Sequence, residues 1–327
     1  MADSSSGMIA ERKRHSFLVN FFIRLVKEKP LGTIGGVITL LLLFTGIFAD
    51  LIAPYGMNET WVGGFLSPPS AEFWLGTDSI GRDMLTLIIF GARISVIVGL
   101  SASMLATTIS SVIGIVCGYI GGKLDLVVQR GVDIWMSLPT LVVLMILITI
   151  MGASIGSVIL ALGFAVGISG SRIMRGAVIN IKENAYLAAA VAIGCPTSRI
   201  LTRHILPNVM STIIVLFSIR VPSMILSEAS LSFLGFGIPP PTPSWGGMLS
   251  GSGRTYMFMS PWLAIWPGLA LAIVVYGVNM FGDAVRDILD PRLRGGVGRY
   301  GVRAKKEAGA RGDGTPKELT GQQKEKE

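Results

Sequence analysis

Long charge-free stretches dominate the pattern of hydrophobic and polar positions along this chain. A helix that crosses about 30 Å of hydrocarbon needs roughly 20 residues with few or no charges. One apolar run, 134–171, is too long for a single span, and the segment 152–156, Gly-Ala-Ser-Ile-Gly, divides it. Another run ends at the triplet 239–241, because prolines remove backbone donors in a medium that offers no replacement. The pattern therefore predicts six membrane-spanning helices, at about residues 31–53, 94–118, 133–151, 157–174, 209–233 and 263–285.

Composition supports a membrane protein and excludes several other classes. The chain has 327 residues, of which 51% are hydrophobic and 15% charged, and its mean hydropathy is +0.64. Globular domains carry about 25% charged residues. Two cysteines and two histidines are too few for a disulfide framework or a zinc site. The predicted fold class is an all-α polytopic membrane protein.

The positions of lysine and arginine predict the orientation in the membrane. With the N-terminus in the cytoplasm, only Arg82, Arg93 and Arg254 of the 28 basic residues fall outside, and Arg220 falls within a span. Cytoplasmic loops carry the excess of basic residues in membrane proteins, so both termini are predicted to be cytoplasmic. The net charge of +8 fits this bias and contact with anionic lipid better than it fits nucleic-acid binding.

The same reading divides the chain into four segments. Residues 1–30 form a cytoplasmic N-terminal segment, and residues 31–93 form the first span and an outer loop. Residues 94–290 form a core of five spans, with an inner loop at about 175–208. Residues 291–327 have the composition of a disordered basic tail.

The inner loop between the fourth and fifth spans is unusually long. Residues 183–193 are alanine-rich and favour a helix, which Gly194 is expected to end. After Pro196, a second helix is predicted from Thr197 to Ile205, before residues 206–208 turn the chain into the next span. Shape alone leaves two readings open: a knob that docks into a protein groove, or a simple connector.

This loop resembles the EAA loop of ABC-transporter permeases, whose pattern is Glu-Ala-Ala, three residues, Gly, nine residues, Ile, one residue, Leu-Pro. Ala189, Ala190, Gly194 and Leu206-Pro207 match that pattern. Ala188 stands where the family usually has glutamate, and His204 where it has isoleucine. The resemblance implies a loop that docks on an ATPase subunit, with contributions from Tyr186, Ala189, Ala190, Gly194, Arg203, Leu206 and Pro207.

Two further segments resemble the peptide-type permeases, in particular the C-type subunit of dipeptide and oligopeptide importers. The first is the Gly-Thr-Asp and Gly-Arg-Asp segment of residues 76–83, and the second combines residues 228–235 with the proline-rich 239–246. From the residues alone, Thr77 or Asp78 is expected to cap a helix beginning at Ser79. Trp245 is expected to pin an outer loop at the membrane interface.

Arg220 and Glu228 are the ionisable residues expected deepest in the membrane. A lone charge at mid-bilayer raises the free energy by about 2.5–3.5 kcal/mol or more, so Arg220 should face a partner or water. A cavity-lining or subunit-interface charge and an interhelical salt bridge are both open readings. The spacing of eight with Pro222 between them argues against a direct Arg220–Glu228 pair. Gly163, Gly167 and Gly170 are expected to allow close helix packing.

The sequence contains no catalytic constellation, no phosphate-binding loop and no metal site. The resemblance implies a non-catalytic permease in a bacterial or archaeal inner membrane, paired with a second homologous permease. Two ATP-binding subunits inside would bind the ATP and magnesium, and a substrate-binding protein would deliver dipeptides or oligopeptides outside. A nickel chelate or another small solute is the alternative cargo.

An ion-gradient-driven secondary transporter is the rival class of protein, but it predicts several acidic residues at mid-membrane. A third alternative, a non-transporting membrane scaffold, would explain neither the predicted docking loop nor the charge of Arg220 within the membrane.

Overall fold

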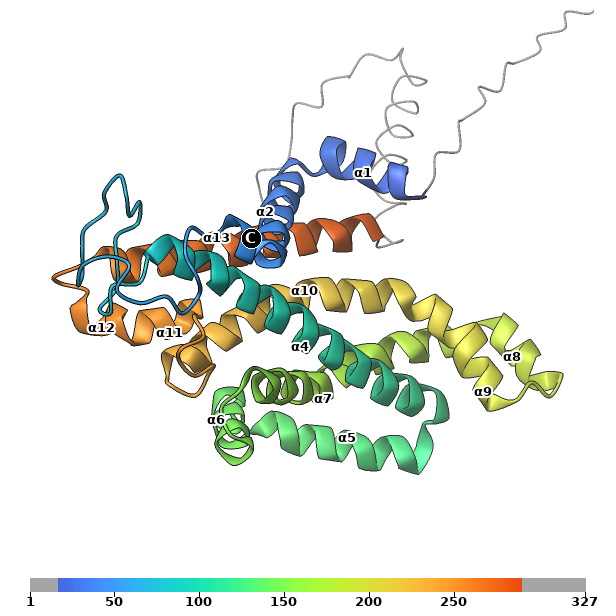
Figure 1. Ribbon diagram of the computed structural model, residues 1–327. Coiled ribbons are helices and arrows are strands. Elements are labelled where there is room, and N and C mark those ends of the chain that lie inside the picture. The colour runs from blue at the N-terminus through green and yellow to red at the C-terminus, as the bar shows by residue number, and fades with distance from the viewer. Residues whose placement is uncertain (1–16, 290–327) are drawn as a thin grey trace, which may run out of the picture.

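The computed structural model describes residues 17–289, and this part of the chain is helical with a single isolated bridge between Thr77 and Asp83. Figure 1 shows α8 (Ala185–Ala192) and α9 (Thr197–Arg199), in the loop predicted to lie inside, at the opposite end of the long helices from α11 (Trp245–Ser250) and α12 (Ser252–Tyr256), which are predicted to lie outside. These two ends are called inner and outer below, after that prediction. Five helices within residues 17–289 are long and apolar enough to cross a membrane, which confirms the all-α membrane fold. They are α2 (Pro30–Ile47), α4 (Met84–Ile120), α7 (Ile155–Lys182), α10 (Leu206–Phe233) and α13 (Trp262–Leu289). The helical residues before α10 make its span begin at Thr197.

The third predicted span, 133–151, is not one straight helix. It is formed by α5 (Gly122–Ser137) and α6 (Thr140–Met151), which meet at an angle of 93°. Leu138, just before Pro139, has the extended backbone that a residue preceding proline prefers. The twelve residues of α6 extend only about 18 Å, so residues 17–289 contain five helices able to span a membrane, or six spans if this bent pair counts as one.

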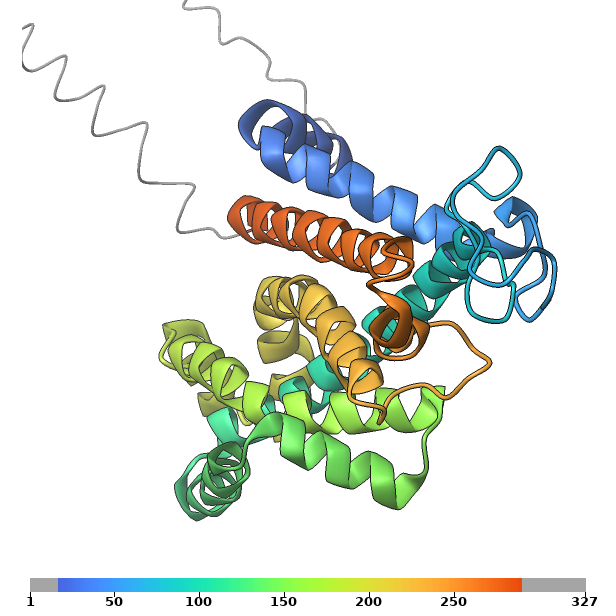
Figure 2. The same ribbon diagram turned by 90° about the vertical axis from the view of Figure 1, so that its left-hand side faces the viewer.

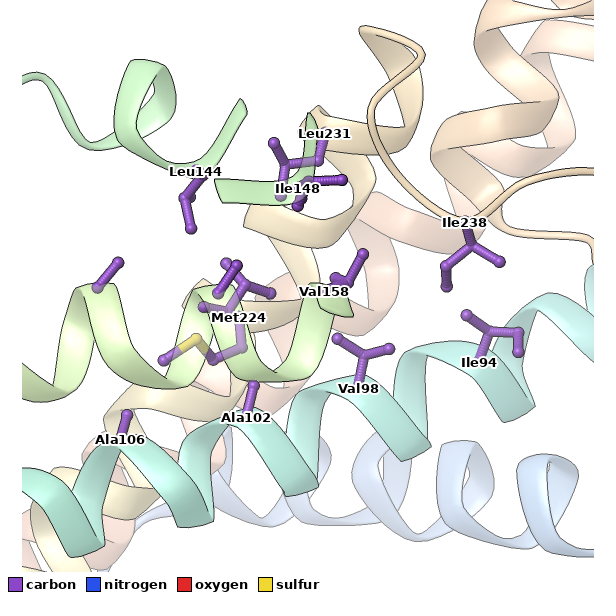
Figure 3. Packing of buried hydrophobic residues seen from close by; sticks show 13 residues of the cluster. Ile94, Val98, Ala102, Ala106, Leu144, Ile148, Val158, Met224, Leu231 and Ile238 are labelled. Atoms are coloured by element: carbon purple, nitrogen blue, oxygen red, sulfur yellow. The ribbon is translucent and has the colours of Figure 1, made fainter. Parts of the chain in front are cut away.

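Three helices enclose the main core. α4 packs along α7 and crosses α10, and α6 covers the outer half of this group. Figure 3 shows Ala102 on α4 beside Met224 of α10, and Val98 on α4 opposite Val158 of α7. Alternating small and large side chains let the helices interdigitate, and their dense packing replaces the hydrophobic driving force that lipid does not provide.

Glycines set the distance between α4 and α7, as the sequence predicted. A Cβ at Gly167 would lie 2.8 Å from Cβ of Ile109, and one at Gly163 would overlap Leu105. On α4, a Cβ at Gly114 would lie 2.6 Å from Cβ of Met174. Each helix therefore presents small residues where the other presents large ones.

The second span begins earlier and is capped differently than predicted. α4 starts at Met84 rather than near residue 94, so the core segment begins ten residues sooner. Its cap is Asp83, whose carboxylate accepts hydrogen bonds from the backbone N–H and hydroxyl of Thr86. The expectation of a helix beginning at Ser79 is wrong, because Asp78 uses its carboxylate inside the preceding turn, on the N–H groups of Ile80 and Arg82.

Two N-terminal helices lie at the edge of the bundle. α1 (Phe17–Glu28) leads into α2, which packs on α13, and the short α3 (Ala49–Ile52) follows (Figure 2). On the outer side, α11 (Trp245–Ser250) and α12 (Ser252–Tyr256) connect α10 to α13. The predictions made for residues 1–16 and 291–327 lie outside the described residues.

Candidate coupling loop and intramembrane polar sites

The inner loop contains a short helix followed by a turn into the fifth span. α8 (Ala185–Ala192) forms as predicted, but the second helix continues without a break into the membrane. α9 (Thr197–Arg199) passes into a π-helical segment, Ile200–Ile205, and that segment passes directly into α10. The predicted turn at residues 206–208 is wrong, because Pro207 falls in the first turn of α10, where proline is tolerated. The loop and the fifth span therefore form one continuous helix from Thr197 to Phe233.

Gly194 ends α8 in the predicted manner. Its φ is +76°, in the left-handed region that favours glycine. Its N–H donates to the carbonyl of Val191, and the next N–H, of Cys195, donates to the carbonyl of Ala190. This pair of bonds is the Schellman pattern, which satisfies the last carbonyls of a helix and reverses the chain.

The loop is packed onto the inner ends of α4 and α7. Leu187 of α8 joins a second core with Ile115 of α4 and Val178 of α7. Lys182 donates to the carbonyl of Tyr119 at 2.7 Å. A further tie joins α8 to α10, since Asn208 donates to the hydroxyl of Tyr186 at 3.1 Å. These contacts hold the loop as a fixed knob rather than a loose connector.

The two matched alanines face opposite ways. Ala190 is buried against the chain's own core, whereas Ala189 is exposed. Around Ala189 lie other exposed apolar side chains, including Val191 at 55% and Ile193 at 84% of full exposure. Arg203 and Pro207 are also exposed and Leu206 is half-buried. The outward surface of the knob is thus apolar with basic residues nearby.

Arg220 lies halfway along α10 and points into the α4–α7–α10 junction, where its residue is 7% exposed. Nη2 donates to the hydroxyl of Ser110 at 2.8 Å, and Nη1 donates to Thr107 at 3.3 Å. The Ser110 hydroxyl in turn donates to the carbonyl of Gly167 on α7 at 2.6 Å. Within the described residues, no carboxylate lies within ion-pair distance of Arg220. The interhelical salt bridge is therefore not formed, and hydroxyl groups solvate the charge.

Glu228 lies two turns further out on α10 and is 1% exposed. It accepts a hydrogen bond from the hydroxyl of Ser232 at 2.7 Å and another from Ser244. Ser232 also accepts the N–H of Ile238 at 3.3 Å, and Ser244 accepts the N–H of Gly247 at 3.1 Å. Glu228 therefore anchors the outer loop between α10 and α11. It forms no pair with Arg220, as the spacing predicted.

Trp245, expected at the membrane interface, is instead a core residue. It is 2% exposed, packs against Gly91 and donates to the carbonyl of Ile88 at 3.1 Å.

Comparison with known proteins identifies the family. Residues 110–295 match the family described as "Binding-protein-dependent transport system inner membrane component". The chain is 35% identical over 268 residues to the oligopeptide transport system permease protein OppC of Bacillus subtilis, covering 82% of this chain and 88% of that one. It is 37% identical over 270 residues to the dipeptide transport system permease protein DppC of Alkalihalophilus pseudofirmus, with the same coverage of both chains. The chain belongs to this family.

Two other likenesses are weaker. The permease is 34% identical over 274 residues to the glutathione transport system permease protein GsiD of Pectobacterium atrosepticum, covering 84% of this chain and 91% of that one. A chain in a solved structure of inward facing conformations of the MetNI methionine ABC transporter has a TM-score of 0.49 and 18% identity. That match covers 64% of this permease and 99% of the other chain.

Some functional contacts of the permease were not apparent from sequence. The two hydroxyl residues that accept hydrogen bonds from Arg220, Thr107 and Ser110, lie on α4. Together with Ser103 they have the spacing of residues on one helix face. This spacing of hydroxyl residues was the sequence signal for a polar face on α4. On the inner side, Arg175 of α7 forms two bonds to Asp125 of α5, at 2.6 and 2.5 Å, and Arg172 pairs with Asp133. These pairs fasten α5 to α7 and could not be assigned without knowing the bend at Pro139.

No cluster of three or more metal-ligating side chains occurs within residues 17–289. That the chain itself binds neither ATP nor magnesium stays a prediction.

Proposed function

We propose that this chain is one of two homologous permease subunits of an ATP-driven importer that moves dipeptides or oligopeptides inward. Two ATP-binding subunits bind at the inner knob and hydrolyse ATP with magnesium, and a substrate-binding protein delivers the cargo outside. The chain contributes helices to the translocation pathway and no catalytic group. The importer alternates between inward-open and outward-open states.

The observation that carries this proposal is the construction of the knob. Its outward side exposes Ala189, Val191 and Ile193, while its inward side is held in the core by Leu187 and Ala190. An exposed apolar surface of this kind suits a protein interface. Because the π-helical segment continues into α10, a partner that displaces the knob also displaces Arg220 and the outer loop anchored by Glu228.

The relatives favour a peptide as the cargo. They are named for oligopeptide, dipeptide and glutathione transport, and these cargoes share amide bonds, a terminal amine and a terminal carboxylate. A nickel chelate shares none of the amide chemistry and is the alternative that the uptake experiment separates.

The charges favour an inner location for the knob and both termini. Lys182 ends α7, and Arg199 and Arg203 lie in α9 and the π-helical segment after it, whereas Arg82 precedes α4, Arg93 lies near its start and Arg254 lies in α12. Figure 1 shows α8 and α9 at the opposite end of the long helices from α11 and α12. This distribution matches the bias of cytoplasmic loops toward basic residues.

An ion-gradient mechanism has less support. Carboxylates at mid-membrane would be expected in a proton or sodium relay. In the described part of α10, Arg220 is held by hydroxyl groups and Glu228 is held in the outer turn, and they do not contact each other.

Uptake into proteoliposomes tests the proposal. The permease pair is reconstituted with its ATP-binding subunits and binding protein, and radiolabelled dipeptide, glutathione and a nickel chelate are supplied in turn. Uptake of a peptide that requires ATP and survives collapse of ion gradients is expected. Uptake that persists without the ATP-binding subunits, or that occurs only with the nickel chelate, would contradict the proposal.

A further inference from the structure

Two sequence motifs that the proposed transport cycle leaves unused meet in one cavity on the outer side. The Gly-Thr-Asp and Gly-Arg-Asp turn supplies Asp78 and Arg82, and the proline-rich loop supplies residues 239–243. The cavity has a volume of about 330 Å³, within the range of small-molecule sites. Segments far apart in sequence thus form one enclosure at the outer end of α4.

Hydrogen bonds between the two sides fix the shape of this cavity. The hydroxyls of Ser79 and Ser252 are 2.8 Å apart, which ties the turn to α12. Trp262 of α13 donates to the carbonyl of Thr77 at 3.2 Å. The opposite wall is the loop that Glu228 anchors through Ser232 and Ser244. A cavity held in this way is organised before a ligand arrives, which lowers the entropy lost on binding.

Arg82 offers the cavity a charged hydrogen-bonding edge. Its Nε donates to Asp78 at 2.7 Å, and its side chain is 19% exposed. Asp78 is itself fixed by the backbone N–H groups of Ile80 and Arg82, so it sets the direction of the guanidinium. Within the described residues, the side-chain bonds of Arg82 all run through Nε, which leaves Nη1 and Nη2 for a ligand. Two parallel N–H donors on one guanidinium match the two oxygens of a carboxylate.

The other nearby carboxylate does not oppose an anionic ligand strongly. Asp83 is 3% exposed and caps the N-terminus of α4, where its carboxylate accepts hydrogen bonds from the backbone N–H and the hydroxyl of Thr86. The accessible apolar floor of the cavity is formed by Met248 and the prolines of 239–241, with the buried Met84, Leu87 and Leu263 beneath them. A carboxylate next to an apolar side chain is the arrangement at the C-terminus of a peptide.

We infer that this cavity is a subsite for the C-terminal residue of a peptide cargo, with Arg82 binding its carboxylate and the apolar floor receiving its side chain. The inference rests on the proposed function, since it concerns the cargo of the same importer. It adds that the permease itself binds the C-terminal carboxylate of the cargo after the binding protein releases it.

Paired peptides test this subsite. Initial uptake rates are measured for a tripeptide with a free C-terminal carboxylate and for the same tripeptide as its C-terminal amide, using one unaltered binding protein throughout. Arg82→Gln should lower uptake of the free acid about tenfold, the range expected for a lost charged hydrogen bond. Uptake of the amide should stay within about twofold. Because the binding protein is constant, a change in the acid-to-amide ratio reports on the permease.

Arg93→Gln is the matched control. Arg93 is also an outer arginine paired with an aspartate, Asp50, at 2.7 Å, but it does not line this cavity. It should leave the acid-to-amide ratio unchanged. An equal loss of both peptides in Arg82→Gln, or an unchanged ratio, would overturn the subsite. If the unaltered importer transports neither peptide, the proposed function fails instead, and that result is recognised before any variant is compared.

A second measurement uses the unaltered complex and so does not depend on the folding of a variant. A tripeptide with a photoreactive last residue should cross-link to Met248 or Pro240, which line the cavity and are accessible. Excess free-acid tripeptide should compete, while the amide should not. Cross-links confined to other parts of the complex, or equal competition by the amide, would overturn the proposal.

Discussion

The Arg220 guanidinium on α10 occupies the space that a side chain at Gly170 on α7 would need. Gly170, which follows Gly163 and Gly167 on α7, thus leaves space for a charged group from another helix, in addition to allowing close backbone packing. This relationship joins the packing of α4 and α7 to the one buried guanidinium of the described membrane core.

Gly170→Ala should displace Arg220 and destabilise the permease by about 1–3 kcal/mol, as overpacking does. The same change made in an Arg220→Ala background should have a much smaller effect, giving a coupling energy of about 1–2 kcal/mol in a double-mutant cycle. The measurement is denaturant unfolding of the purified permease in nanodiscs. Gly176→Ala is the control, because no atom lies within 4 Å of a Cβ at that position of the same helix. Additive effects of the two changes would show that Arg220 does not occupy the position described.

Glu228 should determine the order of the outer loop. Glu228→Leu removes the acceptor of two hydroxyls, and an unsatisfied buried hydroxyl raises the free energy by about 1–3 kcal/mol. Hydrogen exchange of residues 234–247 should therefore become faster, while exchange of the inner knob should not change. Glu228→Gln keeps a carbonyl acceptor and should have a smaller effect. Unaltered exchange in the leucine variant would mean that the prolines hold the loop without Glu228.

Sequence patterns gave the long helices but not their interruptions or partners. Runs of apolar residues are sufficient to locate α2, α4, α7, α10 and α13, since lipid forces backbone bonding within each segment. The bend before Pro139 could not be inferred from hydropathy, because α5 and α6 together are as apolar as one span. The hydroxyl partners of Arg220 and the burial of Trp245 arise from contacts between helices, which the order of residues in one helix does not specify. For the knob, by contrast, the glycine cap is a local property, so Gly194 was predicted correctly.

The orientation can be checked with reporter fusions. A reporter that is active only outside should be active when fused after Gly253, on the side of α11 and α12, and silent when fused after Lys182, at the end of α7. The reason is the bias of cytoplasmic segments toward lysine and arginine. The reverse pattern would invalidate the orientation and the placement of the knob inside.

Gly194→Val should uncouple the ATPase while sparing the spans. A non-glycine side chain in the left-handed region raises the free energy by about 1–2 kcal/mol, and a β-branched one is poorly tolerated there. Because no atom lies within 4 Å of a Cβ at Gly194, the effect comes from the backbone and not from a clash. Gly194→Asn, which accepts this conformation more readily, is the matched control. Co-purification of the ATP-binding subunits should fall for valine and persist for asparagine, and equal retention by both would make the cap unimportant for docking.

The central claim is that the knob passes ATPase movement to the transport pathway, and one comparison tests it most directly. Peptide-loaded binding protein is added to the complete importer in nanodiscs, and its stimulation of ATP hydrolysis is measured for the unaltered permease, Ala189→Trp and Ala190→Trp. Ala189 is exposed on the docking side, so its replacement should abolish the stimulation while the permease unfolds at the same denaturant concentration. Ala190 is buried, so its replacement should also lower the stability of the permease itself. Full stimulation in a stable Ala189→Trp importer would contradict the account.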